Sequence, residues 1–138
     1  MSVRQTVQAK LDKVLLPYGI LSHHLRRVEV DKISGSTVKV NQDEYVVYRV
    51  VSSRGGAHGD GHAQIVRYYV DVNYYYAYEK TDERFVDAEN RIKQIIAEFK
   101  SDRHFCIANG ESDIYDIDNP YRGINVEFLY VEAVKRGG

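Results

Sequence analysis

Apolar and polar residues alternate along a tyrosine-rich segment in the middle of the chain, residues 64–80. Its even positions, apart from the two ends, are all valine or tyrosine, whereas its odd positions include arginine, aspartate and asparagine. A period of two predicts a long β-strand with one buried face. The second face also carries Ile65, Tyr69 and Tyr75. Because tyrosine joins a large apolar ring to a polar tip, this face indicates a surface that contacts another protein.

Two other segments have the 3.6-residue period of an amphipathic helix. The first covers residues 2–16, with Ser2 as the expected N-cap and Pro17 as the stop signal. The second covers residues 81–100, where Thr81 is the expected cap and two acidic residues follow it in the first turn. Its apolar stripe, which we expect to be buried, consists of Phe85, Ala88, Ile92, Ile95, Ile96 and Phe99.

The remaining apolar segments are short, and we interpret most of them as strands. Residues 44–52 are rich in valine and tyrosine, and residues 121–134 alternate apolar with polar positions. Residues 135–138 are expected to form a frayed tail. Weaker patterns predict short strands at 25–30, 37–40, 104–108 and 114–117, with a turn at 109–113.

The long strands at 44–52 and 64–80 are joined by the glycine-rich segment 53–63, SRGGAHGDGHA. We expect a flexible loop there, at the tip of an antiparallel hairpin. Hairpin-type strands with only two helices favour an α+β fold over a parallel α/β sheet. The sequence therefore predicts one domain over residues 1–138, a mainly antiparallel sheet with both amphipathic helices packed on it.

Composition excludes several classes of protein. The formal net charge of −1 lacks the positive excess expected of a nucleic-acid binder. The single cysteine, Cys106, cannot form an internal disulfide, and its apolar neighbours in HFCIA predict a small core residue. No apolar run approaches the roughly 20 residues that span a bilayer, and no signal segment opens the chain. We expect a soluble protein of a reducing cytoplasm.

The motif AHGDGHA in the glycine-rich segment raises the possibility of a metal site. His58, Asp60 and His62 are residue types that bind zinc or nickel. Ordering a glycine-rich loop around an ion would cost much of its affinity, and no second shell is evident. The same segment lacks the Gly-Lys-Ser/Thr ending of a phosphate loop, and a strand follows it, not a helix. We therefore expect a solvated loop with no metal and no cofactor.

Other polar clusters are also interpreted as solvated. HHLRR, residues 23–27, is basic, but Glu29 and Asp31 follow it at once. The acidic run ESDIYDID lacks the central glycine and closing glutamate of a calcium loop. No nucleophile elbow, cysteine–histidine dyad or carboxylate pair in an apolar setting is visible. The sequence therefore predicts a protein that is not an enzyme.

Over residues 44–134 the pattern resembles the tail terminator or tail-completion proteins of long-tailed bacteriophages and prophages. The likeness rests on YVVYRVV, then VRYYVDVNYYYAYEK, then the helix DERFVDAENRIKQIIAEF, then YRGINVEFLYVEA. In that family a strand of the V-x-V-x-Y-x-Y kind, an acidic-capped helix and a closing strand follow one another.

The resemblance implies an α+β subunit of a hexameric ring that caps the tail tube, ends its polymerisation and presents a surface to the head–tail connector. Such a subunit can be a monomer in isolation, belongs to the virion neck, and is assembled in the host bacterial cytoplasm. A ring requires an interface that closes by rotation, and the tyrosine-bearing second face could provide it. The residues expected to make contacts are Arg54, His58, Asp60, His62, Arg67, Tyr69 and Tyr75.

Two alternatives remain open from the sequence. The first is a neck or head-completion protein of the same assembly module, which would bind the connector and not the tail-tube protein. The second is a ligand or nucleic-acid binding module with a ferredoxin-like sheet, in which Tyr69 and Tyr75 would stack on bases. Such stacking usually accompanies a basic groove, which this chain does not display.

Overall fold

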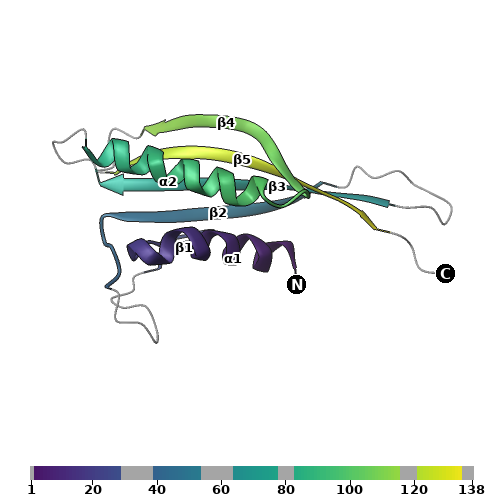
Figure 1. Cartoon of the computed structure of the whole chain (residues 1–138), viewed down its shortest axis with the longest axis horizontal. Helices are drawn as coiled ribbons and strands as arrows, with labels where there is room; N and C mark the ends of the chain where they lie inside the picture. The colour runs from purple at the N-terminus through teal and green to yellow at the C-terminus, as the bar shows by residue number, and fades with distance from the viewer. Residues whose placement is uncertain (1, 29–38, 54–63, 78–82, 116–120, 135–138) are drawn as a thin grey trace.

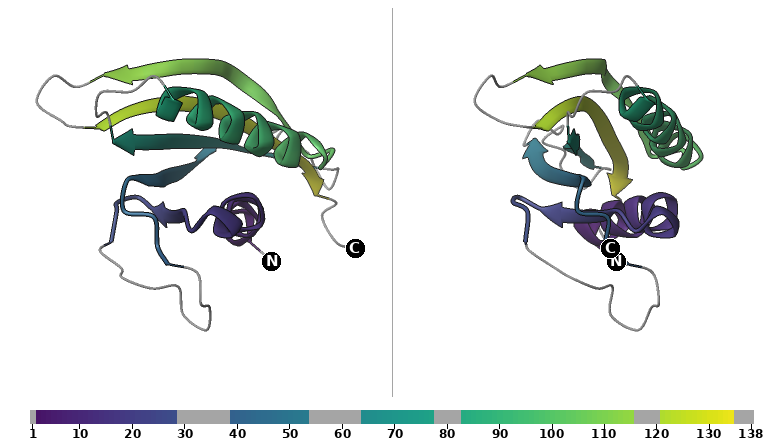
Figure 2. Two further views of the ribbon diagram at one scale, coloured as in Figure 1. Left: turned by 60° about the vertical axis from the view of Figure 1, so that its left-hand side comes forward. Right: turned by 90° about the vertical axis from the view of Figure 1, so that its left-hand side faces the viewer.

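A computed structural model describes residues 2–28, 39–53, 64–77, 83–115 and 121–134 of the chain. Its elements are α1 (Val3–Leu15), η1 (Leu16–Tyr18), β1 (Leu21–His24), β2 (Glu44–Ser53), β3 (Gln64–Ala77), α2 (Glu83–Lys100), β4 (Phe105–Tyr115) and β5 (Tyr121–Val134). The strands form one five-stranded sheet in the order β1-β2-β3-β5-β4. Both α-helices lie on the same side of that sheet (Figures 1 and 2). The predicted α+β fold is confirmed.

The sheet is antiparallel except at one edge. β2 and β3 form the predicted hairpin, paired from Glu44 opposite Tyr76 to Ser53 opposite Arg67. β5 pairs with β3 along its whole length, and β4 pairs with the other edge of β5. β1 joins β2 in parallel, and the connection between them, residues 25–43, is long enough for the crossover that parallel strands require.

The first helix begins and ends where the sequence predicts. The Ser2 side chain accepts a hydrogen bond from the Gln5 backbone, and the Gln5 side chain accepts one from the Ser2 backbone. This reciprocal capping box satisfies two backbone donors at the start of α1. At the other end Gly19 adopts φ +72°, and a Cβ atom there would lie 2.3 Å from the Lys39 carbonyl oxygen. A glycine is therefore required at this turn.

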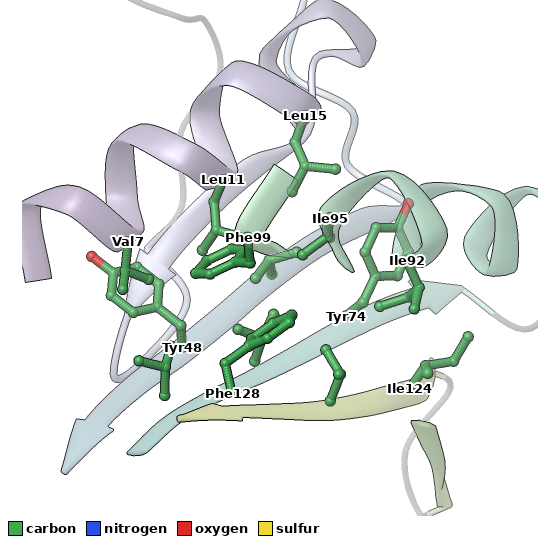
Figure 3. Close-up of a cluster of buried hydrophobic side chains, with 14 of the residues drawn as sticks. Val7, Leu11, Leu15, Tyr48, Tyr74, Ile92, Ile95, Phe99, Ile124 and Phe128 are labelled. Carbon is green, nitrogen blue, oxygen red and sulfur yellow. The ribbon is translucent and has the colours of Figure 1, made fainter. Parts of the chain in front are cut away.

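The hydrophobic core lies between the helices and one face of the sheet (Figure 3). Phe99 of α2 stacks on Phe128 of β5 at 4.3 Å between ring centroids and meets Phe105 edge-on at 5.0 Å. The other large, fully buried side chains come from both helices, β2, β3 and the residue before β1: Leu11, Leu15, Tyr74, Ile20, Ile92, Ile95, Val7, Val46, Val70 and Val72.

The predicted stripe of α2 is buried except at its start, with Ile96 half-buried. Ala88, Ile92, Ile95 and Phe99 are fully buried, but Phe85 is 39% exposed. Phe85 lies in the first turn of α2, beside the end of β3, where its ring is edge-on to Tyr76. The prediction that Phe85 is a core residue is therefore wrong. The expected cap, Thr81, lies outside the described residues.

A buried carboxylate joins three parts of the fold. Glu44, at the start of β2, accepts hydrogen bonds from the Tyr74 hydroxyl at 2.7 Å and the Arg91 guanidinium at 2.8 Å. Its second oxygen accepts one from the Asn41 side chain at 2.9 Å. Arg91 also lies over the Tyr18 ring, 4.6 Å from its centroid. Burial and then the nearby carboxylate raise the pKa of Tyr74, so its hydroxyl remains a donor.

Two of the weaker strand predictions do not match the structure. The first strand is Leu21–His24 and not 25–30, because Leu25 adopts φ +73° and turns the chain away from β2. Residues 29 and 30 lie outside the described part, as do 37 and 38 of the segment 37–40. In that segment Lys39 forms an isolated bridge and Val40 is outside any strand.

The region of β4 corrects two further predictions. A single strand covers Phe105–Tyr115, and the expected turn at 109–113 is instead a stretch of irregular pairing with β5. Register shifts around Asn109 absorb the turn-forming residues, as β-bulges do at sheet edges. Phe105 points into the core, so the next residue, Cys106, faces the other way and is exposed. Cys106 is therefore not a core residue.

Candidate interaction surface

The sheet has a second face that neither helix covers, which we name the open face (Figure 2). It carries the residues of β2, β3 and β5 that alternate with the core positions, in agreement with the period of two in the sequence. Among the described residues these side chains are half-buried or exposed, except Gly123. Along the strands the open face divides into an aromatic cluster, a polar strip and an apolar row.

The aromatic cluster consists of Arg27, Tyr45, Tyr75 and Tyr121. The rings of Tyr45 and Tyr75 stack at 5.1 Å, and Tyr121 meets Tyr45 edge-on at 5.3 Å. The Arg27 guanidinium lies 4.2 Å from the centroid of Tyr45 and 5.6 Å from that of Tyr121. Cation–π contacts of this kind stabilise a cationic side chain on an aromatic surface.

Hydrogen bonds hold Arg27 in the aromatic cluster. Its guanidinium donates to the Gln42 carbonyl oxygen at 2.9 Å and to the Tyr121 hydroxyl at 3.1 Å. Arg27 is thus half-buried and partnered, so HHLRR is not the fully solvated turn that we expected. Burial raises the pKa of Tyr45 and of Tyr75, so both phenols stay neutral and offer hydroxyl groups.

The polar strip crosses the middle of the open face. Asn125 donates to the Asp71 carboxylate at 2.6 Å and to the Asn73 side-chain oxygen at 2.8 Å. Arg49 lies 3.8 Å from Asp71, and its side chain is 62% exposed. Positive and negative groups are interspersed here, so the strip lacks the one-signed field that a nucleic-acid backbone requires.

The apolar row lies beyond the polar strip, toward the end of β2 and the start of β3 and β4. Its members face one another across four strands: Val51 is opposite Tyr69, Tyr69 is opposite Leu129, and Leu129 is opposite Cys106. Val51 is 43% exposed and Tyr69 38%. Ile65, farther along β3 on the same face, is also exposed. A contiguous exposed apolar surface is typical of a contact site.

The structure places three residues of the predicted contact set on the open face. Tyr69 belongs to the apolar row, Arg67 is two residues away on the same face, and Tyr75 belongs to the aromatic cluster. The other four predicted residues lie outside the described part of the chain: Arg54, His58, Asp60 and His62. The flexible loop predicted at 53–63 also lies outside the described residues beyond Ser53, and so does the predicted tail at 135–138.

Sequence reasoning missed Arg27, Tyr45 and Tyr121 as one cluster. Arg27 and Tyr121 are separated by 94 positions, and no local spacing connects them. The only signal in the sequence was the prediction of strands at 44–52 and 121–134, which contain Tyr45 and Tyr121. The hollow beside Arg27 has a volume of about 10 Å³, which is the size of one water molecule. The aromatic cluster is thus a packed surface and not a ligand pocket.

Comparison with known proteins leaves the open face as the main guide to function. No known family model and no curated protein matches this chain. In the part of the chain that the structure describes, no three histidine, cysteine or acidic residues are placed to share a metal ion. None of the described helices is long and apolar enough to cross a membrane.

Proposed function

We propose that this protein is the tail terminator of a long-tailed bacteriophage or prophage. In this role its copies form a hexameric ring at the head-proximal end of the tail tube. The ring ends tube polymerisation and presents a surface to the head–tail connector. The protein acts in the virion neck after assembly in the host bacterial cytoplasm, and it catalyses no reaction.

The observation that carries this proposal is the contrast between the two faces of the sheet. Both helices pack on one face, and the other face exposes apolar side chains on adjacent strands, including Val51 and Tyr69. Exposed apolar surface of this kind favours a role in assembly. The α+β fold agrees with the fold that the sequence resemblance implies.

A reconstitution experiment tests the proposal. Purified protein is added to polymerising tail-tube protein encoded by the same phage or prophage, and the products are imaged by negative-stain electron microscopy. We expect six-fold rings at one end of tubes whose growth has stopped. Tubes that continue to grow at unchanged rates, with no ring at either end, would contradict the proposal.

The same assay separates the neighbouring role in the assembly module. A head-completion protein would bind the purified connector and leave tube growth unchanged, whereas a terminator binds the tube. A nucleic-acid module is the other alternative, and the exposed ring of Tyr69 favours it. Salt-sensitive binding of single-stranded nucleic acid, without ring formation, would support that alternative.

A further inference from the structure

A second exposed apolar site lies on the helix layer of the molecule, at the start of α2. Phe85 is 39% exposed and Val86 is 50% exposed, although α2 otherwise directs its large apolar residues into the core. Phe85 is held in place by its edge-on contact with Tyr76, at 6.4 Å between centroids. We name Phe85 and Val86 the helix-start patch.

The helix-start patch and the apolar row lie at opposite ends and on opposite sides of the subunit. Phe85 contacts Tyr76, which is seven residues along β3 from Tyr69 of the apolar row. At a strand rise of about 3.3 Å per residue these two positions are about 23 Å apart. Tyr76 faces the helices and Tyr69 the open face. One copy therefore cannot bring its own two sites into contact.

Exposed charges of opposite sign lie beside the two sites. Arg49 and Arg67 are on the same face as the apolar row. Arg49 is two residues before Val51 on β2, and Arg67 is two residues before Tyr69 on β3. Asp87 and Glu89 follow the helix-start patch directly on α2, and Asp87 is exposed. Asp71 and Glu127 lie at the same spacing on the open face, but Asp71 is less exposed (24%) than its partner Arg49 (62%), so the more accessible charge of that pair is positive. An exposed arginine and the exposed Asp87 favour contact between the two sites, whereas pairing two helix-start patches would bring like charges together.

We propose that the helix-start patch of one copy packs on the apolar row of the next copy. This inference rests on the proposed ring and names its subunit contact. Because the two surfaces are different, each subunit contacts one neighbour through its helix-start patch and the other through its apolar row. The contact therefore repeats head to tail. A head-to-tail contact that closes by rotation makes a ring, which is the kind of assembly that the proposed function needs.

The native cysteine provides a direct test. Cys106 is exposed in the apolar row, so Val86→Cys places a second thiol on the opposing patch. A disulfide requires Cα atoms within about 7 Å, so it forms only if the two sites meet. After mild oxidation at high protein concentration, alone and with tail-tube protein, we expect a reducible ladder of linked copies up to the hexamer.

Matched variants make the result specific. Lys93→Cys puts an exposed thiol on α2 seven residues farther along, about 10 Å from Val86, and should yield no ladder. Val86→Cys combined with Cys106→Ala should also yield none. Dimers alone, through Cys106 of two copies, would mean that the apolar rows pair face to face, and would overturn the inference.

A charge exchange gives a second measurement that does not depend on thiols. Arg49→Glu or Asp87→Arg alone should raise the concentration needed for assembly by about tenfold or more, and the double variant should restore much of the loss. Independent effects of the two changes would overturn the contact. Rings without the predicted cross-link refute this inference but leave the proposed function intact, whereas absence of both rings and tube capping refutes the function itself.

Discussion

The two faces of the sheet are built from the same residue types but perform different tasks. Tyr74 and Tyr75 are neighbours in β3, yet Tyr74 is fully buried and donates to Glu44, whereas Tyr75 is half-buried and stacks on Tyr45 at the surface. The helices make this difference, because they remove water from only one face (Figure 1). A tyrosine on the covered face supports the fold, and a tyrosine on the open face is available for contact.

The covered face should therefore hold most of the folding free energy. Its side chains are surrounded by neighbours on the sheet and in the helix layer, and burial of each large apolar side chain contributes about 1.5–3 kcal/mol. Side chains of the open face touch only their lateral neighbours. Their substitution should change stability little and change assembly more, and the following predictions test that contrast.

The largest effect is expected at the centre of the covered face. Phe99→Ala removes the ring that stacks on Phe128 and meets Phe105 edge-on, and should lower the free energy of unfolding by about 4 kcal/mol. Phe85→Ala is the matched control on the same helix, and should cost about 1 kcal/mol because Phe85 is already partly in water. Urea denaturation followed by circular dichroism measures both. Equal losses would contradict the contrast.

The next effect is expected at the buried carboxylate. Glu44→Ala leaves the Arg91 guanidinium without its anionic partner in a site where its side chain is only 16% exposed, and should cost about 3 kcal/mol. Replacing both residues, as Glu44→Leu with Arg91→Met, should be less destabilising than Glu44→Ala. On the open face Arg49→Ala, which removes an exposed partner of Asp71, should cost at most about 0.5 kcal/mol. Chemical denaturation of the three variants compares them.

An intermediate effect is expected in the aromatic cluster. Tyr75→Ala removes a half-buried ring that stacks on Tyr45, and should lower the free energy of unfolding by about 1.5 kcal/mol. Arg27→Met keeps the length of the side chain but removes the cation–π contacts, and should cost about 1 kcal/mol. A loss above 3 kcal/mol in the thermal or urea unfolding of either variant would show that this part of the open face belongs to the core.

A smaller, pH-dependent effect is expected at Asp102, after the end of α2. The backbone N–H of His104, followed by its ring and then Lys10, lowers the pKa of the Asp102 carboxyl below its ordinary value of 3.8. A lowered folded-state pKa adds stability above pH 3.8, and that stability disappears as pH falls through the folded-state value.

Asp102→Asn keeps the shape but not the charge of this side chain, so it should unfold more easily than the parent protein between pH 5 and pH 7. The difference should shrink as pH falls below about 3.8. Thermal unfolding between pH 2.5 and pH 7 measures it. A difference that stays constant over this range would assign the effect to hydrogen bonding and not to charge. Asp113→Asn, at an exposed position of β4, is the control.

The last effect is expected in the apolar row and concerns assembly more than stability. Tyr69→Ser changes a side chain that is 38% exposed, about as much as Phe85, and should lower the free energy of unfolding by about 1 kcal/mol. It should nevertheless abolish rings in electron micrographs, and Tyr69→Phe should preserve them because the ring supplies the apolar area. Normal assembly of Tyr69→Ser would remove the apolar row from the proposed contact.

Elements whose signals are local were predicted well. The N-cap and apolar stripe of α1, the stripe of α2 and the alternation of β3 each lie within one segment, and each element formed where its pattern indicated. The turn predicted at 109–113 is wrong because pairing with β5 extends β4 through residues that favour turns in isolation. The core assignment of Cys106 failed for a related reason, since composition around a residue does not say to which face it points.

The sequence by itself determined which residues alternate in β3, which helix faces are apolar, and that one side of the sheet would keep tyrosines beside polar groups, because these patterns depend on periods of two and 3.6 residues. Only the tertiary structure decided which tyrosines became core, how Arg27 met Tyr45 and Tyr121, and that Val51, Tyr69, Leu129 and Cys106 form one row. Those outcomes depend on strand order and register, which join residues far apart in the chain.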